Sequence, residues 1–134
     1  MPERIDWEPL IAAARQAAAR AHAPYSRFAV GAALLMEDGT VVAGCNVENR
    51  SYGLTMCAER TAIGAAVSRG LTRPRALAVV TTTAPPSAPC GMCRETLREF
   101  AEDLPILLVN PDGRRVETTL AELLPFPFEL PGRG

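Results

Sequence analysis

Residues 28–47 read FAVGAALLMEDGTVVAGCNV and predict two β-strands joined by a tight turn. The runs 28–36 and 40–47 are rich in apolar and β-branched residues, as strands commonly are. Between them, Glu37, Asp38 and Gly39 form a short polar segment that contains a glycine, which is typical of a hairpin connection. We therefore expect an antiparallel hairpin at the start of a sheet.

The sequence on both sides of this hairpin predicts helices that alternate with further strands. Upstream, Asp6 is a candidate N-cap for a helix that runs to about His22, and Pro24 is expected to end it. His22 is expected to be a solvated residue at that helix end, far from the motifs. Downstream we expect helices at 57–69 (with Gly70 as the stop), 90–102 and 119–124, strands at 76–83, 106–109 and 114–117, and a loop at 84–89. This order predicts an α/β fold with a mixed sheet covered by helices on both faces.

The composition is that of an ordinary globular protein and fits one domain spanning residues 1–134. Hydrophobic residues make up 48% of the chain and charged residues 22%. The 14 basic residues, all arginine, balance 15 acidic ones and are not clustered, so we expect a small-molecule partner and no nucleic acid. The sequence contains neither a signal-peptide core nor an apolar run of membrane-spanning length. We therefore expect no membrane partner and a cytoplasmic protein whose thiols stay reduced.

Three cysteines and a glutamate form the pattern that indicates chemistry. Cys57 is followed by Glu59, and Cys90 and Cys93 form a Cys-x-x-Cys pair. All three cysteines stand at expected helix starts, where unpaired backbone N–H groups favour an ionised thiolate. Three thiolates around one Zn²⁺ leave the fourth tetrahedral position open for water, and this distinguishes a catalytic zinc site from a structural one. We predict a catalytic site of this kind.

Charged neighbours suit such a site. Glu59 can reach a water molecule at the metal without binding the metal itself, which is the place of a proton shuttle. Three thiolates around Zn²⁺ carry a net negative charge, which has to be offset if the water is to ionise near neutral pH. Either Arg60 or Arg94 could donate hydrogen bonds to the ligand sulfurs. We favour Arg60, because a spacing of three residues places it on the same helical face as Cys57.

Other interpretations of the cysteines stay open at this point. A Cys-x-x-Cys pair also occurs in redox proteins and as half of a structural zinc site. Cys45 would close the coordination sphere if it were a fourth ligand, but its place in the middle of a strand favours packing as a small apolar side chain. A redox dithiol would leave the third cysteine and Glu59 without a role.

Four motifs in order resemble the cytidine deaminase family, in its small, homotetrameric, zinc-dependent form, and the resemblance covers nearly the whole chain. The motifs are 23–33 (APYSRFAVGAA), 44–49 (GCNVEN), 57–62 (CAERTA) and 89–94 (PCGMCR), and residues 123–125 with Phe128 resemble the family's C-terminal segment. The resemblance implies an α/β fold of three α/β/α layers around a mixed, mostly five-stranded sheet. It also implies one Zn²⁺ per subunit and a homotetramer whose pockets are completed by neighbouring subunits.

The same resemblance implies roles for individual residues. Asn46 and Glu48 would grip the ribose together, and Phe28 would form a flat apolar wall for the pyrimidine ring. The backbone N–H of Ala58 would hold the ring carbonyl. Neighbouring subunits would contribute residues 50–52 and 125–128, including Tyr52 and Phe128.

The implied reaction is the hydrolytic deamination of cytidine and deoxycytidine to uridine and deoxyuridine, with release of ammonia. Glu59 would take a proton from water at the metal and deliver it to the ring nitrogen beside the amine-bearing carbon. It would then protonate the amine so that ammonia can leave.

One residue departs from the family pattern, which usually has glutamine after the Cys-Arg pair. This chain has Glu95 there. The carboxylate would either add negative charge beside the metal cluster or pair with Arg94 or Arg60.

Three further hypotheses compete with cytidine deamination. The first is a deaminase of a modified or antibiotic cytosine nucleoside of the blasticidin S type, and the second is a catalytically inactive zinc-binding scaffold. The third, a polynucleotide deaminase, is disfavoured by the absent basic surface and by a cysteine where such relatives usually have histidine. The intact Phe28 and the Asn46 to Asn49 motif favour an ordinary ribose.

Overall fold

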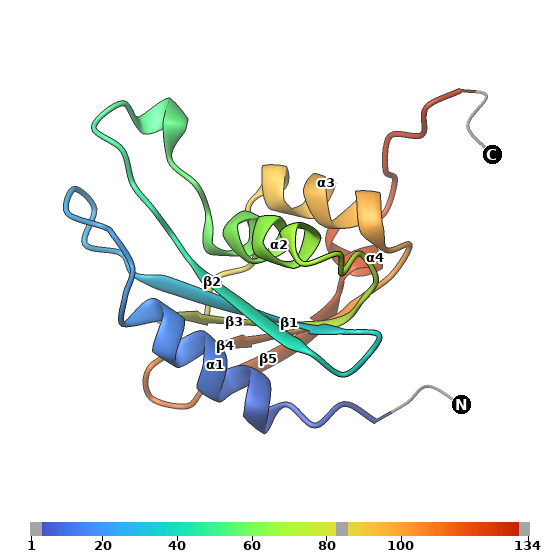
Figure 1. Ribbon diagram of the computed structural model, residues 1–134, viewed down its shortest axis with the longest axis horizontal. Helices are drawn as coiled ribbons and strands as arrows, with labels where there is room; N and C mark the ends of the chain where they lie inside the picture. The colour runs from blue at the N-terminus through green and yellow to red at the C-terminus, as the bar shows by residue number, and fades with distance from the viewer. Residues whose placement is uncertain (1–3, 83–85, 132–134) are drawn as a thin grey trace.

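The computed structural model describes residues 4–82 and 86–131. The last residue of the strand expected at 76–83, residues 84–85 of the next loop and the three residues at each chain end lie outside the described residues. A mixed sheet of five strands, in the order β2-β1-β3-β4-β5, has α1 on one face and α2, α3 and α4 on the other (Figure 1). The predicted three-layer α/β/α architecture is confirmed. The elements are α1 (Glu8–Ala18), β1 (Val30–Met36), β2 (Val41–Cys45), a 3-10 turn (Tyr52–Leu54), α2 (Ala58–Ser68), β3 (Pro74–Thr81), α3 (Gly91–Phe100), β4 (Pro105–Val109), β5 (Arg115–Thr119) and α4 (Leu120–Leu123).

The predicted hairpin joins β1 and β2 in antiparallel register, with Gly31 opposite Cys45 and Leu35 opposite Val41. Its turn requires a glycine, because Gly39 has a φ of 91° that other residues adopt only with strain. The carboxylate of Asp38 accepts a hydrogen bond from the Thr40 backbone N–H at 2.9 Å and so stabilises the turn.

The central strands place the second and third helices. β1 is also antiparallel to β3, whereas β3 and β4 run parallel and therefore need a crossover, which α3 supplies. Loops at the carboxyl end of a strand in a parallel pair are the usual place for a ligand site. The loop from β3 to α3 leaves from that end and leads directly to Cys90.

The sheet separates two apolar cores, because successive residues of a strand point to opposite faces. In β1, Ala32, Leu34 and Met36 pack toward α2 and α3, whereas Ala33 packs toward α1. On that second face, α1 contributes Leu10 and Ile11. None of the described helices is long and apolar enough to cross a membrane.

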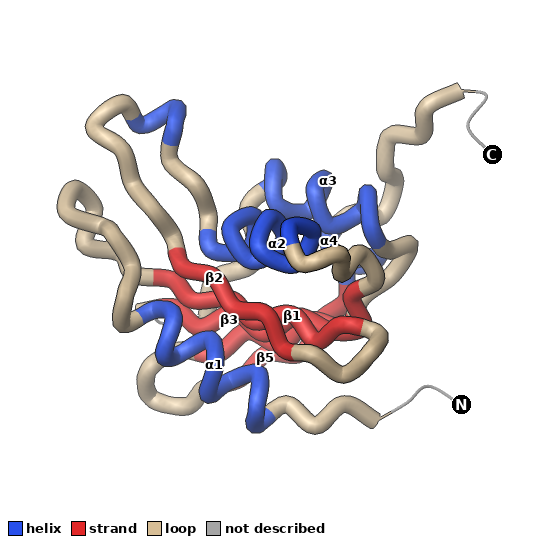
Figure 2. The backbone as a smooth tube through the Cα atoms, in the orientation of Figure 1, coloured by secondary structure: helices blue, strands red, loops and turns tan. Residues whose placement is uncertain are grey.

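The first helix is shorter than the sequence predicts. It ends at Ala18, because the chain then tightens into turns and the backbone N–H of His22 bonds to the Asn46 carbonyl at 3.0 Å. His22 is exposed as expected, but the prediction that it lies far from the motifs is wrong, since it forms a bridge with Val47. Figure 2 shows the two long loops that this bridge joins, which precede β1 and follow β2 and project beyond the same end of the sheet.

Candidate metal centre

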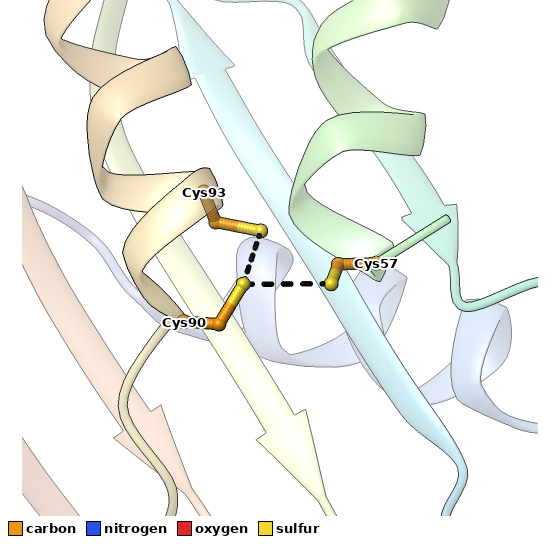
Figure 3. A group of neighbouring side chains, drawn as sticks. All are labelled: Cys57, Cys90 and Cys93. Atoms are coloured by element: carbon orange, nitrogen blue, oxygen red, sulfur yellow. Dashed lines mark hydrogen bonds between the residues drawn. The ribbon is translucent and has the colours of Figure 1, made fainter. Parts of the chain in front are cut away.

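Two helix starts meet above the sheet and bring the three predicted cysteines together. Cys57 is the N-cap residue of α2 and Cys90 that of α3, both with extended backbone, and Cys93 lies in the first turn of α3. Figure 3 shows the three side chains pointing toward one another from these two helices. Within the described residues they form the one group of side chains that could hold a metal ion.

The spacing of the sulfurs fits a tetrahedral zinc ion. Cys57 Sγ lies 3.6 Å from Cys90 Sγ, and Cys90 Sγ lies 3.5 Å from Cys93 Sγ. Sulfurs bound to one Zn²⁺ at tetrahedral angles stand about 3.8 Å apart. Cys45 does not belong to this group and sits half-buried in β2. The donor set therefore suits a zinc ion with three protein ligands.

Hydrogen bonds around the sulfurs favour the thiolate at Cys57. The hydrogen bond with Cys93, together with Arg60, lowers the pKa of Cys57 to about 5. Arg60 Nη2 donates to Cys57 Sγ at 3.5 Å and to the Thr55 carbonyl at 3.2 Å, which agrees with the helical-face argument. The hydrogen bond with Cys57, burial and the nearby Glu59 charge all raise the pKa of Cys93. Arg60 thus offsets part of the negative charge that three thiolates would bring.

Glu59 is a buried carboxyl beside this group. The residue is only 4% exposed, and burial raises its pKa to about 7, with a further contribution from the Cys57 charge. A carboxyl with a pKa close to neutrality can both accept and release a proton under ordinary conditions.

A cleft of about 340 Å³ opens next to the cysteines, within the usual size range of small-molecule pockets. Many of the residues that the sequence singled out line it: Phe28, Asn46, Glu48, Cys57, Ala58, Glu59 and Cys90. Ala58 opens α2, so its backbone N–H belongs to the turn whose donors lack helical partners.

Asn46 and Glu48 face the cleft, but their polar atoms already hold the loop that precedes β1. The Asn46 side chain accepts from the Val30 N–H at 2.9 Å and donates to the Phe28 carbonyl at 2.7 Å. Glu48 accepts from the N–H groups of Tyr25 and Ser26 and from the Ser26 hydroxyl. The hydrogen bond from Ser26 lowers the pKa of Glu48 and keeps it ionised. These two side chains therefore shape the wall that carries Phe28.

Two residues assigned to the pocket from the resemblance lie outside the cleft of this chain. Tyr52 is 64% exposed and packs edge-on against Tyr25, with ring centroids 5.9 Å apart. Phe128 is 71% exposed and lies in a groove with Glu95 and Arg98. Glu95 thus lines this groove on α3, and within the described part of the chain it forms no ion pair with Arg60 or Arg94.

Arg94 does not contact the ligand sulfurs in the way that the sequence left open. Its Nε donates to the Pro89 carbonyl at 2.8 Å, and its Nη1 donates to the Leu123 carbonyl at 2.9 Å. The helical spacing from Cys57 identified Arg60 as the sulfur donor, but no local pattern predicts the long-range contact of Arg94.

Sequence reasoning also missed residues of the cleft wall. Val79 and Thr81 of β3 line the cleft from below, and Ser26 lines it beside Glu48. A signal for Thr81 was available, because it is a polar residue at the carboxyl end of a strand that is otherwise apolar. No comparable signal marks Ser26, since its role depends on a fold that brings it next to Glu48.

The fold and the site together define a class of protein, the enzymes with an α/β/α fold and a zinc site formed at two helix starts. Residues 6–107 match the family model described as the cytidine and deoxycytidylate deaminase zinc-binding region. The chain therefore belongs to the cytidine and deoxycytidylate deaminase family, and it carries that family's zinc-binding domain.

Individual relatives agree with this assignment. A cytidine deaminase of Sporosarcina psychrophila is 51% identical over 125 residues, which cover 92% of each chain. The crystal structure of a cytidine deaminase from Burkholderia pseudomallei superposes with a TM-score of 0.88 at 46% identity, covering 92% of this chain and 100% of that one. A blasticidin-S deaminase of Bacillus cereus is more distant, at 34% identity over 114 residues, 74% of this chain and 76% of that protein.

Proposed function

We propose that this protein, with residues 1–134 acting as one catalytic domain, hydrolyses cytidine and deoxycytidine to uridine and deoxyuridine and releases ammonia. The observation that carries the proposal is a buried carboxyl, Glu59, in a nucleoside-sized cleft beside three converging cysteine sulfurs. The similarity to cytidine deaminases over most of the chain supports the same substrate class.

Cys57, Cys90 and Cys93 would hold one Zn²⁺ per subunit. When bound, the ion supplies Lewis acidity, which makes water a nucleophile near neutral pH. Arg60 donates to the Cys57 sulfur and draws charge away from the ligand set, so that three thiolates remain compatible with this acidity.

Glu59 would move the protons of the reaction. It takes one from the attacking water and passes it to the ring nitrogen beside the amine-bearing carbon. It then takes the second proton from the hydroxyl now on that carbon and gives it to the amine, so that the carbon–nitrogen bond breaks, the carbonyl forms and ammonia leaves. The net change is one water consumed and one ammonia released, and the carboxyl is regenerated. A pKa near 7 suits both halves of this cycle, because neither gaining nor losing the proton is strongly uphill.

The cleft wall would orient the nucleoside. Phe28 offers a flat face to the pyrimidine, and the Ala58 N–H at the start of α2 points a positive dipole at the ring carbonyl. Asn46 has one amide N–H left after its bond to Phe28, and Glu48 retains acceptor capacity on its carboxylate. Both can therefore take a sugar hydroxyl while they continue to hold the loop before β1.

Tyr52 and Phe128 would complete the pocket of a neighbouring subunit in a homotetramer. Both are largely exposed, and Phe126, two residues before Phe128 in the C-terminal segment, is 96% exposed. Aromatic side chains left in water on projecting segments favour an interface. We also expect the protein to work in the cytoplasm, where its four cysteines stay reduced.

The test is ultraviolet monitoring of cytidine, deoxycytidine and blasticidin S with purified protein of known zinc content. We expect loss of both nucleosides and little or no change in blasticidin S. Turnover confined to blasticidin S would instead support the antibiotic-type deaminase, and zinc-loaded protein that releases no ammonia would identify an inactive scaffold.

A further inference from the structure

Arg94 links two segments that are far apart in the sequence. Its guanidinium is half-buried and donates to the carbonyl of Pro89, directly before Cys90, and to the carbonyl of Leu123, the last residue of α4. The link therefore joins the loop that carries a metal-site cysteine to the end of the last helix.

The Pro89 end of this link lies directly before Cys90, one of the three cysteines of the metal centre. Cys90 precedes α3 with extended backbone and makes no side-chain capping bond. Pro89 is buried and has no N–H, so its carbonyl is its single backbone hydrogen-bonding group. The bond from Arg94 thus fixes the peptide plane from which Cys90 begins.

The Leu123 end is a firm anchor. Although α4 is short, Thr119 caps it by accepting from the Glu122 N–H at 3.1 Å. The Asp103 carboxylate accepts from the Ala121 N–H at 3.0 Å, and the Leu120 N–H bonds to the Leu104 carbonyl at 2.9 Å. Because α4 is tied to the chain around β4 in this way, its final carbonyl offers Arg94 a fixed point.

We propose that Arg94 is a positioning residue that holds Cys90 in ligand geometry by clamping the Pro89 carbonyl to the end of α4. The inference rests on the proposed function only in assuming that the three sulfurs bind zinc. It assigns Arg94 a role different from that of Arg60, which contacts the Cys57 sulfur itself. The clamp also couples the metal centre to the C-terminal segment, which leaves the body of the protein directly after α4 (Figure 1).

Arg98 provides a matched control one turn further along α3. Its Nη2 donates to Glu129 Oε1 at 2.7 Å, so it too ties α3 to the C-terminal segment. Among the residues that the structure describes, Arg94 bonds to the loop before Cys90 and Arg98 does not. A comparison of the two arginines therefore separates positioning of the metal loop from general attachment of the C-terminal segment.

The test measures zinc release from the full-length, zinc-loaded protein to a colorimetric chelator, for Arg94→Met, Arg94→Lys and Arg98→Met. Methionine keeps much of the apolar stem and removes every donor. We expect release about tenfold faster for Arg94→Met, because loss of groups that orient a ligand weakens metal sites by about 10- to 100-fold. Arg94→Lys should lie between, since it can hold one carbonyl, and Arg98→Met should match the wild type.

Substitution with Co²⁺ adds a spectroscopic readout of the sulfur ligands. The thiolate-to-cobalt absorption should shift or weaken in Arg94→Met and stay unchanged in Arg98→Met. Equal release rates and spectra for the two methionine variants would overturn the proposal. If Arg94→Met does not fold, Arg94→Lys decides, and wild-type release in that variant would overturn it as well. If zinc leaves Arg94→Met faster than Arg98→Met but the wild-type protein does not deaminate cytidine, the proposed function is refuted and the role of Arg94 stands.

Discussion

On both faces of the sheet a helix packs closely against a glycine of a strand, but only one face carries the candidate metal centre. On one face, a side chain at Gly31 would overlap the Ala14 carbonyl oxygen of α1. On the other, a side chain at Gly44 would lie 2.5 Å from the Ala62 nitrogen of α2. Each helix backbone rests directly on a strand because the glycine has no Cβ.

The difference lies at the helix starts. The first helix begins at Glu8 and buries only apolar residues, Leu10, Ile11 and Ala14. The second begins at Cys57, buries Glu59 in its first turn, and meets the start of α3. Both faces are closely packed, and on one of them the starts of α2 and α3 bring three cysteines and a buried carboxyl together.

The largest expected effect is loss of the metal when a sulfur is removed. Cys90→Ser should bind no stoichiometric zinc and show no turnover, because two thiolates and a hydroxyl make a poor zinc site. Cys45→Ser, whose sulfur lies outside the group, should retain the metal. Metal analysis after dialysis decides, and a zinc-free Cys45→Ser protein would mean that the ligand set is wrong.

Removing the Glu59 carboxyl should lower the activity nearly as much as removing a sulfur, but the protein should keep its zinc. Glu59→Ala is expected to lower kcat by about 10²- to 10⁴-fold, the range for loss of a proton-transfer group. Zinc content and circular dichroism should stay as in the wild type. Glu95→Ala is the control, since that carboxylate lies on the outer groove of α3. A Glu59→Ala enzyme with more than a tenth of wild-type turnover would refute the role of Glu59.

A pH effect on stability should appear in the metal-free protein. Folding raises the pKa of Glu59 from 4.5 to about 7, so the folded state holds its proton more tightly than the unfolded state. Below about pH 4 the carboxyl is protonated in both states and does not lower the free energy of unfolding. As the pH rises it lowers that free energy increasingly, by about 3 kcal/mol above pH 8. Glu59→Gln should be more stable than the wild type by up to that amount at pH 8. Urea unfolding at both pH values checks this, and a pH-independent difference would contradict it.

The smallest expected effect compares the two glycines directly. Gly44→Ala should displace the start of α2 and lower turnover per bound zinc by about tenfold, because small misplacements of catalytic groups are costly. Gly31→Ala should leave that turnover within about twofold. Both should destabilise the fold by about 1 to 3 kcal/mol through overpacking. Equal losses of turnover would show that the faces are not functionally distinct.

Local patterns predict most of the fold. The hairpin, the helix at Cys57 and its stop at Gly70 follow from short-range signals, and Gly70 has the expected positive φ of 79°. The end of α1 is wrong by about four residues because a long-range backbone bond from His22 to Asn46 competes with the helix. No local signal reveals such a bond.

In the candidate site, too, some features follow from local sequence patterns and others depend on tertiary structure. The cysteines, Glu59 and Arg60 are predictable because helix starts and helical spacing are local properties. The contacts of Arg94 depend on where α4 ends in space, and so they could not be read from spacing. The bonds of Glu48 to the loop before β1 likewise depend on tertiary structure.

Zinc K-edge X-ray absorption on protein loaded with one equivalent of metal tests the central claim most directly. We expect three sulfur donors at about 2.3 Å and one lighter donor at about 2.0 to 2.2 Å, in the open position that water would occupy. A shell of four sulfurs, with Cys45 recruited as a ligand, would contradict it, because no site for an attacking water would remain.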